Sequence, residues 1–388
     1  MEWVSAYIGL DLLGSKKSVS LFGGSMLYRL ASFLKKPDNE PYVSIDVGTS
    51  AIKVMSVDLS GGKPKLLSAG LVPTPAHALS NNSVTKPEQI AAAIRSLLDA
   101  NDIKTTRASF VVPGTCAFTK KITIAYSSLK ELNANIAFEA GNYVPNSIDA
   151  VHLDYQVLRA NGKSTIEVLL VAVKNEIVRS YYNAVEQAGL EPVIADVDYF
   201  ALENMFELNY PEEKHRTIAL INIGARYSSV NIIQSGESLF AGDVGVGGRL
   251  YTDALCESLG MQAAEAEHAK MGTPVNGYDE HVINETRDRT TEHVASELHR
   301  QLGFFWNAAA TDKSIDAIYV CGGSAQVPGF LEELSAKTGM NCTLVNAFRN
   351  VEWAENFDEE FVGEIGLSMG VSVGLAIRRL GDKVQAIS

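Results

Sequence analysis

A compact polar group near the start of the sequence, in the stretch VSIDVGTSAIKV, could bind a phosphate or a metal. Asp46, Gly48, Thr49, Ser50 and Lys53 stand between two apolar runs whose alternation predicts two strands joined by a tight turn. Gly48 would let the backbone approach a ligand, and the N–H and hydroxyl groups of Thr49 and Ser50 could face phosphate oxygens. Lys53 would add a positive charge, and Asp46 would face a hydrated Mg²⁺ that bridges the phosphates. A plain turn is the alternative, and no Walker loop GxxxxGK[ST] occurs in the chain.

The same pattern recurs later in the chain, in ALINIGARYSSVNIIQ. Asn222 occupies the position of Asp46, and Gly224 and Ala225 follow it at the turn. Two copies this far apart predict an internal duplication with two similar halves. The alternative is a coincidence of two ordinary hairpins.

Two more glycine-rich turns each follow a strand. In DVGVGGRLYTDAL, Gly247 and Gly248 open a helix whose N-terminus can face an anion. In YVCGGSAQVPGF, Gly322, Gly323 and Ser324 follow an apolar strand, and the bare backbone leaves room for a flat ring or a phosphate. The four turns together favour a phosphate-binding protein over a chance set of loops.

The amino-acid composition limits the class of protein to which the chain can belong. The 388 residues are 46% hydrophobic and 20% charged, as is ordinary for a globular protein, and the net charge of -13 argues against binding to nucleic acid. The four cysteines show no metal-ligand or disulfide spacing, and no apolar run is long enough to span a membrane. A reducing cytosol is the expected environment.

Two local patterns predict helices. Leu27, Leu30 and Leu34 recur at helical spacing among basic residues, which predicts a short basic amphipathic helix that could contact a membrane surface; a locally packed or disordered tail is the alternative. Further on, Thr85 and Glu88 predict a capping box at the start of a helix.

The arrangement of the four turns resembles the actin-like ATPase superfamily. That resemblance implies an α/β, actin-like (ribonuclease H-like) two-domain ATPase fold with an inserted small α+β subdomain, closing on ATP with Mg²⁺. Within the superfamily, the chain resembles the PilM family of type IV pilus assembly and, less closely, FtsA. The segments that carry this resemblance are YVPNSIDAVHLDYQVL, EVLLVAVKNEIVRSYYNAVEQAGLEPVIADVDYFALENMF, DVGVGGRLYTDAL, AEHAKMG and SELHRQLGFFW.

The resemblance also assigns roles to residues. Asp198 would position the attacking water, although an N-cap for the helix after it is the local alternative. Glu267 and Lys270 would lie near the ribose and adenine, although a surface ion pair is the local alternative. Asp46 would hold the metal through water. The full nucleotide site implied comprises Asp46, Gly48, Thr49, Ser50, Lys53, Asn222, Gly224, Ala225, Gly247, Gly248, Glu267, Lys270, Gly322, Gly323 and Ser324.

The implied domain division follows the same resemblance. Residues 1–40 would form an N-terminal extension, and the inserted α+β subdomain 1C would span 107–189. Subdomain 1A would comprise 41–106, 190–216 and 366–388, subdomain 2A would comprise 217–265 and 304–365, and subdomain 2B would span 266–303.

One departure from the superfamily bears on activity. The second phosphate motif of actin-like ATPases carries an Asp, whereas this chain has Asn222. An amide can still accept a hydrogen bond from metal-bound water, but a charge-assisted bond is about twice as strong as a neutral one. We therefore expect ATP to bind and hydrolysis to be slow or absent.

The resemblance implies a cytoplasmic protein at the inner-membrane face. Its expected partner is the N-terminal peptide of PilN, bound in a nucleotide-dependent way in a groove between the inserted unit and the first domain. It would reach the PilO/PilC platform and the PilB/PilT motors indirectly; association with the membrane would be peripheral, and self-association is left open. The alternatives are an FtsA-like membrane-tethered filament protein and a small-molecule kinase, which would need a catalytic base and a polar substrate pocket.

Overall fold

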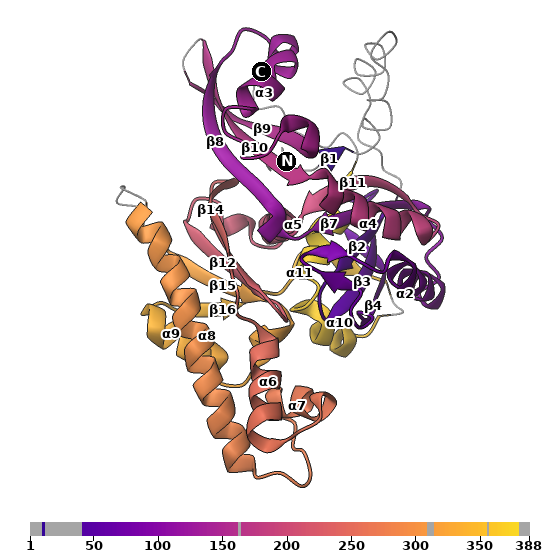
Figure 1. The fold of residues 1–388 in the computed structure, drawn as a ribbon, viewed down its shortest axis with the longest axis vertical. Helices are drawn as coiled ribbons and strands as arrows, with labels where there is room; N and C mark the ends of the chain where they lie inside the picture. Colours follow the sequence, from indigo (N-terminus) through magenta and orange to yellow (C-terminus); the bar gives the residue numbers. More distant parts are fainter. Residues whose placement is uncertain (1–9, 12–40, 162–163, 309–313, 355–356, 380–388) are drawn as a thin grey trace. The chain divides into compact units, whose positions relative to one another are not determined.

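The computed structural model describes residues 10–11, 41–161, 164–308, 314–354 and 357–379 (Figure 1). The chain forms two compact units. Unit 1 contains Met1–Leu208, Asn350–Phe357 and Val371–Ser388, and unit 2 contains Asn209–Arg349 and Asp358–Gly370. The predicted amphipathic helix at residues 27–36 lies outside the described residues. The predicted subdomains are finer than these two units, and their boundaries stay predictions.

Unit 1 is built on a seven-stranded sheet with the order β1-β11-β7-β2-β3-β4-β17. Strands β2, β3 and β4 form an antiparallel meander, while β7 and β11 run parallel to β2. Strands β2, β7 and β11 are buried almost throughout, which explains their near-continuous apolar sequences. The strands are β1 (Leu10–Asp11), β2 (Val43–Val47), β3 (Ala51–Asp58), β4 (Lys65–Pro73), β7 (Arg107–Val112), β11 (Glu191–Val197) and β17 (Glu352–Trp353), with the small hairpin β5 (Leu79–Ser80) and β6 (Ser83–Val84).

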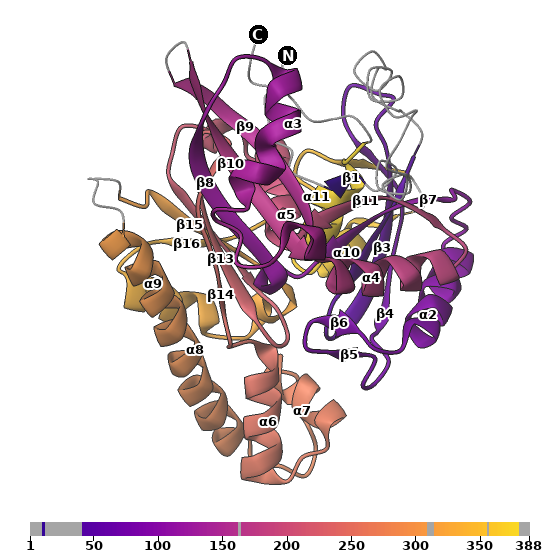
Figure 2. The ribbon, with the colours of Figure 1, turned by 45° about the horizontal axis from the view of Figure 1, so that its top comes forward.

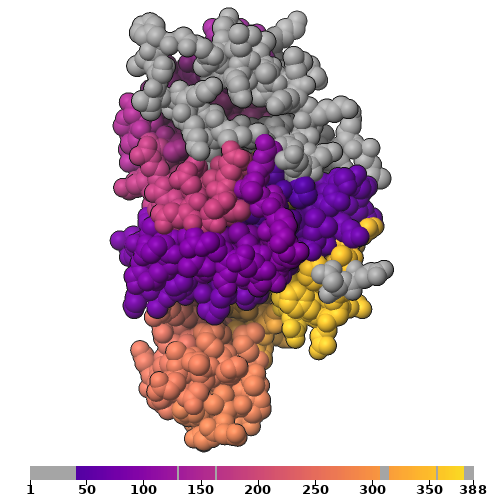
Figure 3. All heavy atoms as spheres, turned by 90° about the vertical axis from the view of Figure 1, so that its right-hand side faces the viewer, coloured from indigo at the N-terminus to yellow at the C-terminus, as the bar shows by residue number. Residues whose placement is uncertain are grey.

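Four helices pack on this sheet. Helices α2 (Pro87–Ala100) and α4 (Asn175–Gln187) contact each other, and the face of unit 1 that carries them is seen in Figure 3. Helix α11 (Gly370–Ala376) lies against β2, where the Ser44 hydroxyl donates to the Ser372 carbonyl at 3.1 Å. A Cβ at Gly374 would come within 1.6 Å of the Ala201 carbonyl in α5 (Asp198–Asn209), so only glycine allows this helix contact.

A buried ion pair joins the end of the described chain to the sheet. Arg378 donates to the Asp196 carboxylate at 2.5 Å, and the two side chains are 2% and 0% exposed. Asp196 lies in β11, so the pair fixes the segment after α11 to that strand. Loss of one partner would remove the direct charge pairing of the other in the core.

A smaller three-stranded antiparallel sheet, β8-β10-β9, lies within unit 1. Its apolar face packs with helix α3 around residues such as Ile122, Ile136 and Val168, and this makes a core of its own. Its elements are β8 (Ala117–Ala125), α3 (Leu129–Ala140), β9 (Val151–Asn161) and β10 (Thr165–Lys174). The two-residue strand β1 is the edge strand of the seven-stranded sheet; it pairs with β11 and also lies against β9.

Unit 2 contains a five-stranded sheet with the order β14-β13-β12-β15-β16 (Figure 2). Apolar residues of one face, among them Ile221, Val230 and Val320, pack into a single core with residues of α6, α8 and α9. The elements are β12 (Ile218–Ile223), β13 (Ser228–Gln234), β14 (Glu237–Val244), α6 (Gly248–Leu259), α7 (Ala263–Lys270), α8 (Glu280–Ala308), β15 (Ala317–Cys321), α9 (Phe330–Thr338), β16 (Cys342–Leu344) and α10 (Glu359–Gly366).

The two units share a strand topology. In each, a strand and its hairpin partner are followed by a third antiparallel strand, and a later parallel strand pairs with the first: β7-β2-β3-β4 in unit 1 and β15-β12-β13-β14 in unit 2. This agreement is what the predicted duplication requires.

The predicted capping box at Thr85 is wrong. Helix α2 begins at Pro87 with Lys86 at the N-cap and no side-chain cap hydrogen bond. The Thr85 hydroxyl instead donates to the His77 carbonyl at 3.1 Å, so the turn before the helix uses the group that the sequence assigned to the cap.

Among the described helices, none combines the length and apolar character that crossing a bilayer requires.

Candidate functional site

Three of the predicted glycine-rich turns meet at one edge of the unit 2 sheet. Strands β12 and β15 are parallel and place Asn222 opposite Cys321, so the turns after them emerge side by side. Strand β14 ends at this edge too, because its Val244 pairs with Ser228 at the start of β13. We call residues 222–225, 247–248 and 322–324 the turn cluster.

Backbone hydrogen bonds join the three turns. The N–H of Gly248 donates to the Gly224 carbonyl at 2.9 Å, and the N–H of Arg249 donates to the Ala225 carbonyl at 2.8 Å. The Ser324 hydroxyl donates to the same Gly224 carbonyl at 3.4 Å. The turn cluster is therefore one structure within unit 2.

Two glycines of the turn cluster are required by this close packing. A Cβ at Gly247 would lie 2.6 Å from the Gly224 carbonyl, and one at Gly322 would lie 2.4 Å from the Ile223 carbonyl, with φ at +94°. Gly323 differs, because it is exposed and a Cβ there would meet only Ser368 Cβ, at 4.0 Å. No contact within the fold therefore explains the bare backbone at Gly323, which is free to border a ligand.

A buried lysine lies beside the turn cluster. Lys270, at the end of α7, is 6% exposed and donates to Glu267 at 2.5 Å. Glu267 also accepts from the Thr252 hydroxyl, which donates to the Gly248 carbonyl at 3.2 Å. A Cβ at Gly248 would lie 3.3 Å from Lys270 Nζ and 2.1 Å from Ser324 Oγ. The predicted ion pair thus exists, and it lies next to the predicted nucleotide residues, so the two interpretations are compatible.

The fourth turn lies in unit 1, at the tip of the β2–β3 hairpin. Asp46 and Lys53 are paired across the hairpin, with Nζ and Oδ2 separated by 3.0 Å. The turn is closed by the N–H of Gly48, which donates to the Ala51 carbonyl at 3.0 Å. Thr49 and Ser50 are exposed at the tip, where their N–H and hydroxyl groups can reach a ligand.

Asp198 lies on the same edge of the unit 1 sheet, two strands away from Asp46. Strands β2, β7 and β11 are parallel neighbours, so their carboxyl ends share that edge. Asp198 Oδ1 accepts the N–H of Gly114 at 3.0 Å, and helix α5 begins at Asp198 itself. The side chain therefore ties two strand ends together, and the predicted water-positioning and N-cap roles of Asp198 stay predictions. Tyr181 is buried nearby, and burial raises its pKa, with smaller contributions from Cys116, Asp198 and Asp46.

These residues suit a nucleotide better than a directly bound metal. The turn cluster offers open glycine backbone and a hydroxyl, and the buried Lys270 lies beside it; these are the groups expected around phosphates and a ribose. Within the described ranges, no three His, Cys, Asp or Glu side chains converge as metal ligands. Asp46 already has a cationic partner in Lys53, so Mg²⁺ would fit here only as a hydrated ion carried by phosphates. When bound, Mg²⁺ would neutralise phosphate charge.

Sequence reasoning missed several polar contacts of these sites. Thr74 donates its hydroxyl to the Gly48 carbonyl at 2.6 Å and its N–H to the Ser50 carbonyl at 2.9 Å. Thr252 connects Gly248 with Glu267 in the way described above. Thr74 is remote in sequence from the turn that it supports, so no local signal identifies it, whereas Thr252 lies within the segment DVGVGGRLYTDAL, four residues after Gly248.

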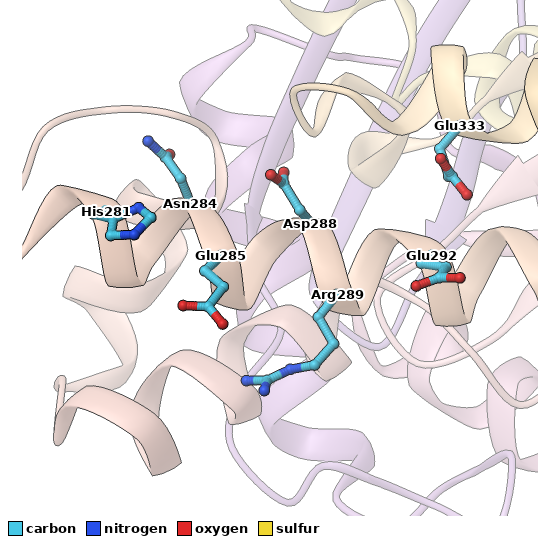
Figure 4. A pocket seen from close by; sticks show the side chains of 7 residues that line it. All are labelled: His281, Asn284, Glu285, Asp288, Arg289, Glu292 and Glu333. Atoms are coloured by element: carbon cyan, nitrogen blue, oxygen red, sulfur yellow. The ribbon is translucent and has the colours of Figure 1, made fainter.

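A separate hollow of about 590 Å³ lies along α8 and the start of α9 (Figure 4). Its lining is mostly acidic, and Lys337 pairs with two of the carboxylates, at 3.1 Å from Glu292 and 3.6 Å from Glu333. None of the predicted site residues lines it. The lining residues are His281, Asn284, Glu285, Asp288, Arg289, Glu292 and Glu333.

Comparison with known proteins identifies the family. The model of the family described as "Type IV pilus assembly protein PilM" matches residues 44–380. A solved structure described as the "PilM-PilN type IV pilus biogenesis complex" is similar over 88% of this chain and 99% of that chain, at 26% identity and a TM-score of 0.77.

More distant relatives support the fold. MreB5 of Spiroplasma citri, in a structure bound to ADP, is similar over 87% of this chain and 95% of its own, with 11% identity and a TM-score of 0.51. The cell division protein FtsA of Bacillus subtilis (strain 168) is 23% identical over 268 residues, 63% of this chain. This chain spans 60% of that relative's length. The predicted fold class is confirmed: the chain has the actin-like ATPase fold.

Proposed function

Because the chain belongs to the PilM family of type IV pilus assembly proteins, we propose that it binds the N-terminal cytoplasmic tail of PilN and that ATP controls this binding. The observation that carries the proposal is the similarity to a PilM–PilN complex over 88% of this chain. The family match over residues 44–380 covers nearly all of the described part of both units, apart from β1 and residues 41–43.

The turn cluster supports the nucleotide part of the proposal. It gathers eight of the predicted nucleotide residues, including the exposed backbone at Gly323, and two more, Glu267 and the buried Lys270, lie beside it. ATP would contact it through backbone N–H groups and the lysine, while the tip of the β2–β3 hairpin is the predicted phosphate-binding turn of unit 1. An ADP-bound relative with the same fold is consistent with nucleotide binding.

The edge of the unit 1 sheet supports the peptide part. Strand β11 pairs antiparallel with β1, with Leu10 opposite Ala195 and Asp11 opposite Ile194. This edge can therefore hold an extended segment by main-chain hydrogen bonds, beside β9 of the inserted sheet. We propose that the PilN tail adds to β11 at this edge. The protein would then act at the cytoplasmic face of the inner membrane and transmit its nucleotide state to the pilus motors through the assembly platform.

ATP would serve as a structural ligand in this proposal. Asn222 removes a negative charge from the second phosphate motif, so we expect slow or absent hydrolysis and a conformational use of the nucleotide.

The test is a titration of fluorescently labelled PilN N-terminal peptide with the full chain. Saturable binding supports the proposal. The same peptide with proline substituted at alternate positions is the matched control, because proline cannot donate the ladder hydrogen bonds of an added strand. Absence of binding to the natural peptide, with or without ATP, would remove the assignment to PilN.

A further inference from the structure

A row of polar residues crosses the unit 2 sheet at the edge that carries the turn cluster. Asn222 in β12 is opposite Ser229 in β13, and Ser229 is opposite Asp243 in β14. Residues directly opposite each other on neighbouring strands project on the same face of a sheet. Asn222, Ser229 and Asp243 therefore share one face at the mouth of the turn cluster (Figure 2 shows β13 and β14 side by side).

This face is opposite the core of unit 2. The residues that alternate with the polar row, Ile223, Val230 and Val244, are buried in the apolar core with α6, α8 and α9. Since side chains alternate between the two faces along a strand, the polar row faces away from that core. The apolar core therefore does not explain the polar character of the row; within unit 2, Asn222 Oδ1 accepts a weak hydrogen bond from Cys321 Sγ at 3.8 Å.

Asp243 is the one charged member of the row. It is partly buried, and no hydrogen bond or ion pair joins its carboxylate to the part of the chain that the structure describes. Burial raises its pKa from 3.8 to about 6, so it is still mainly ionised at pH 7. Asp46, in contrast, has Lys53 at 3.0 Å. A partly buried carboxylate with no cationic partner among the described residues can pair with a cation that arrives with a ligand.

The spacing of the row suits a hydrated ion. Neighbouring strands are about 4.8 Å apart, so the backbones at positions 222 and 243 are separated by about 10 Å, with the Ser229 hydroxyl between them. Mg²⁺ retains several of its waters in protein sites, and these waters extend its reach to such side chains.

We propose that Asp243 supplies, through water, the negative charge toward nucleotide-bound Mg²⁺ that Asn222 lacks. This inference rests on the proposed nucleotide binding. The second phosphate motif itself then lacks an acid, but an acidic side chain, Asp243, lies on the same face of the sheet two strands away.

The test compares how strongly Mg²⁺ tightens ATP binding in matched variants of the full chain. ATP affinity is measured by titration calorimetry in EDTA and in excess Mg²⁺, and the ratio of the two dissociation constants is the readout. A hydrogen bond to a charged group contributes about 1.5 to 3 kcal/mol, so Asp243→Asn should reduce this ratio about 10- to 150-fold. Affinity in EDTA should not fall.

Two further variants complete the design. Asp253→Asn makes the same chemical change on the exposed side of α6, where Arg249 is 3.4 Å away, and should leave the ratio unchanged. Asn222→Asp adds a charge to the row and should raise the ratio, which keeps the test informative if Asp243→Asn does not fold. An unchanged ratio in a folded Asp243→Asn, or in Asn222→Asp, would overturn the inference. A parent chain that binds no ATP in either condition would instead overturn the nucleotide proposal itself.

Discussion

Replacing Gly323 with alanine separates a ligand contact from a folding requirement. In the free protein, the added Cβ would meet only Ser368 Cβ, at 4.0 Å, and Gly323 does not have a positive φ. The free energy of unfolding should therefore change by no more than about 0.5 kcal/mol. If nucleotide lies against this backbone, the methyl group overpacks the complex at a cost of about 1 to 3 kcal/mol, which weakens binding about 5- to 150-fold.

The neighbouring Gly322 provides the contrast. Alanine there would place Cβ 2.4 Å from the Ile223 carbonyl at a φ of +94°, so Gly322→Ala should destabilise the protein before any ligand is added. Urea unfolding of the free variants and a titration with fluorescent ATP measure the two effects separately. ATP affinity equal to that of the parent in Gly323→Ala would refute the placement of nucleotide at this turn.

Three further predictions concern stability and the N-terminal segment. Burial raises the pKa of Asp243 from 3.8 to about 6, so ionisation of this group lowers the stability of the protein as the pH rises through that range. In urea unfolding, Asp243→Asn should be as stable as the parent at pH 4 and more stable by up to about 3 kcal/mol at pH 7.5. Equal stability of variant and parent at both pH values would contradict this. Arg378→Met should cost about 3 to 5 kcal/mol because it removes the guanidinium that pairs with the buried Asp196 carboxylate, and Asp196→Leu/Arg378→Met should recover much of the loss. A single variant as stable as the parent would show that this pair matters little. A chain that starts at Pro41 lacks β1, which pairs with β11, and should therefore bind the PilN peptide more tightly than the full chain. Added peptide of residues 1–20 should compete and weaken that binding. Equal PilN affinities of the two chains would mean that β1 does not occupy the binding edge.

The hairpins and glycine turns could be predicted from the sequence because their signals are local. Alternating apolar residues around Gly48 and Gly224 mark two strands and a turn, and the repeat of that pattern indicates the duplication that both sheets display. Gly322 could also be predicted as a turn residue with close backbone contacts, because a pair of glycines directly after an apolar strand is typical of such a turn.

What the sequence did not reveal depends on long-range register. The placement of Asp243 beside Ser229 follows from the pairing of β13 with β14, which includes an irregularity between Ile232 and Ile233. A shift of one residue would have moved Asp243 to the apolar face. Local competition explains the wrong capping box, where the Thr85 hydroxyl has a closer use in the preceding turn.

The central claim is that ATP binding and capture of the PilN tail are coupled, and one measurement addresses it directly. The dissociation constant of the PilN peptide is measured with and without saturating ATP, and that of ATP with and without saturating peptide. Linkage requires both to change by the same factor, and allosteric couplings of about 1 to 3 kcal/mol predict a factor of roughly 5 to 150. Peptide affinity that is identical with and without bound ATP would contradict the account.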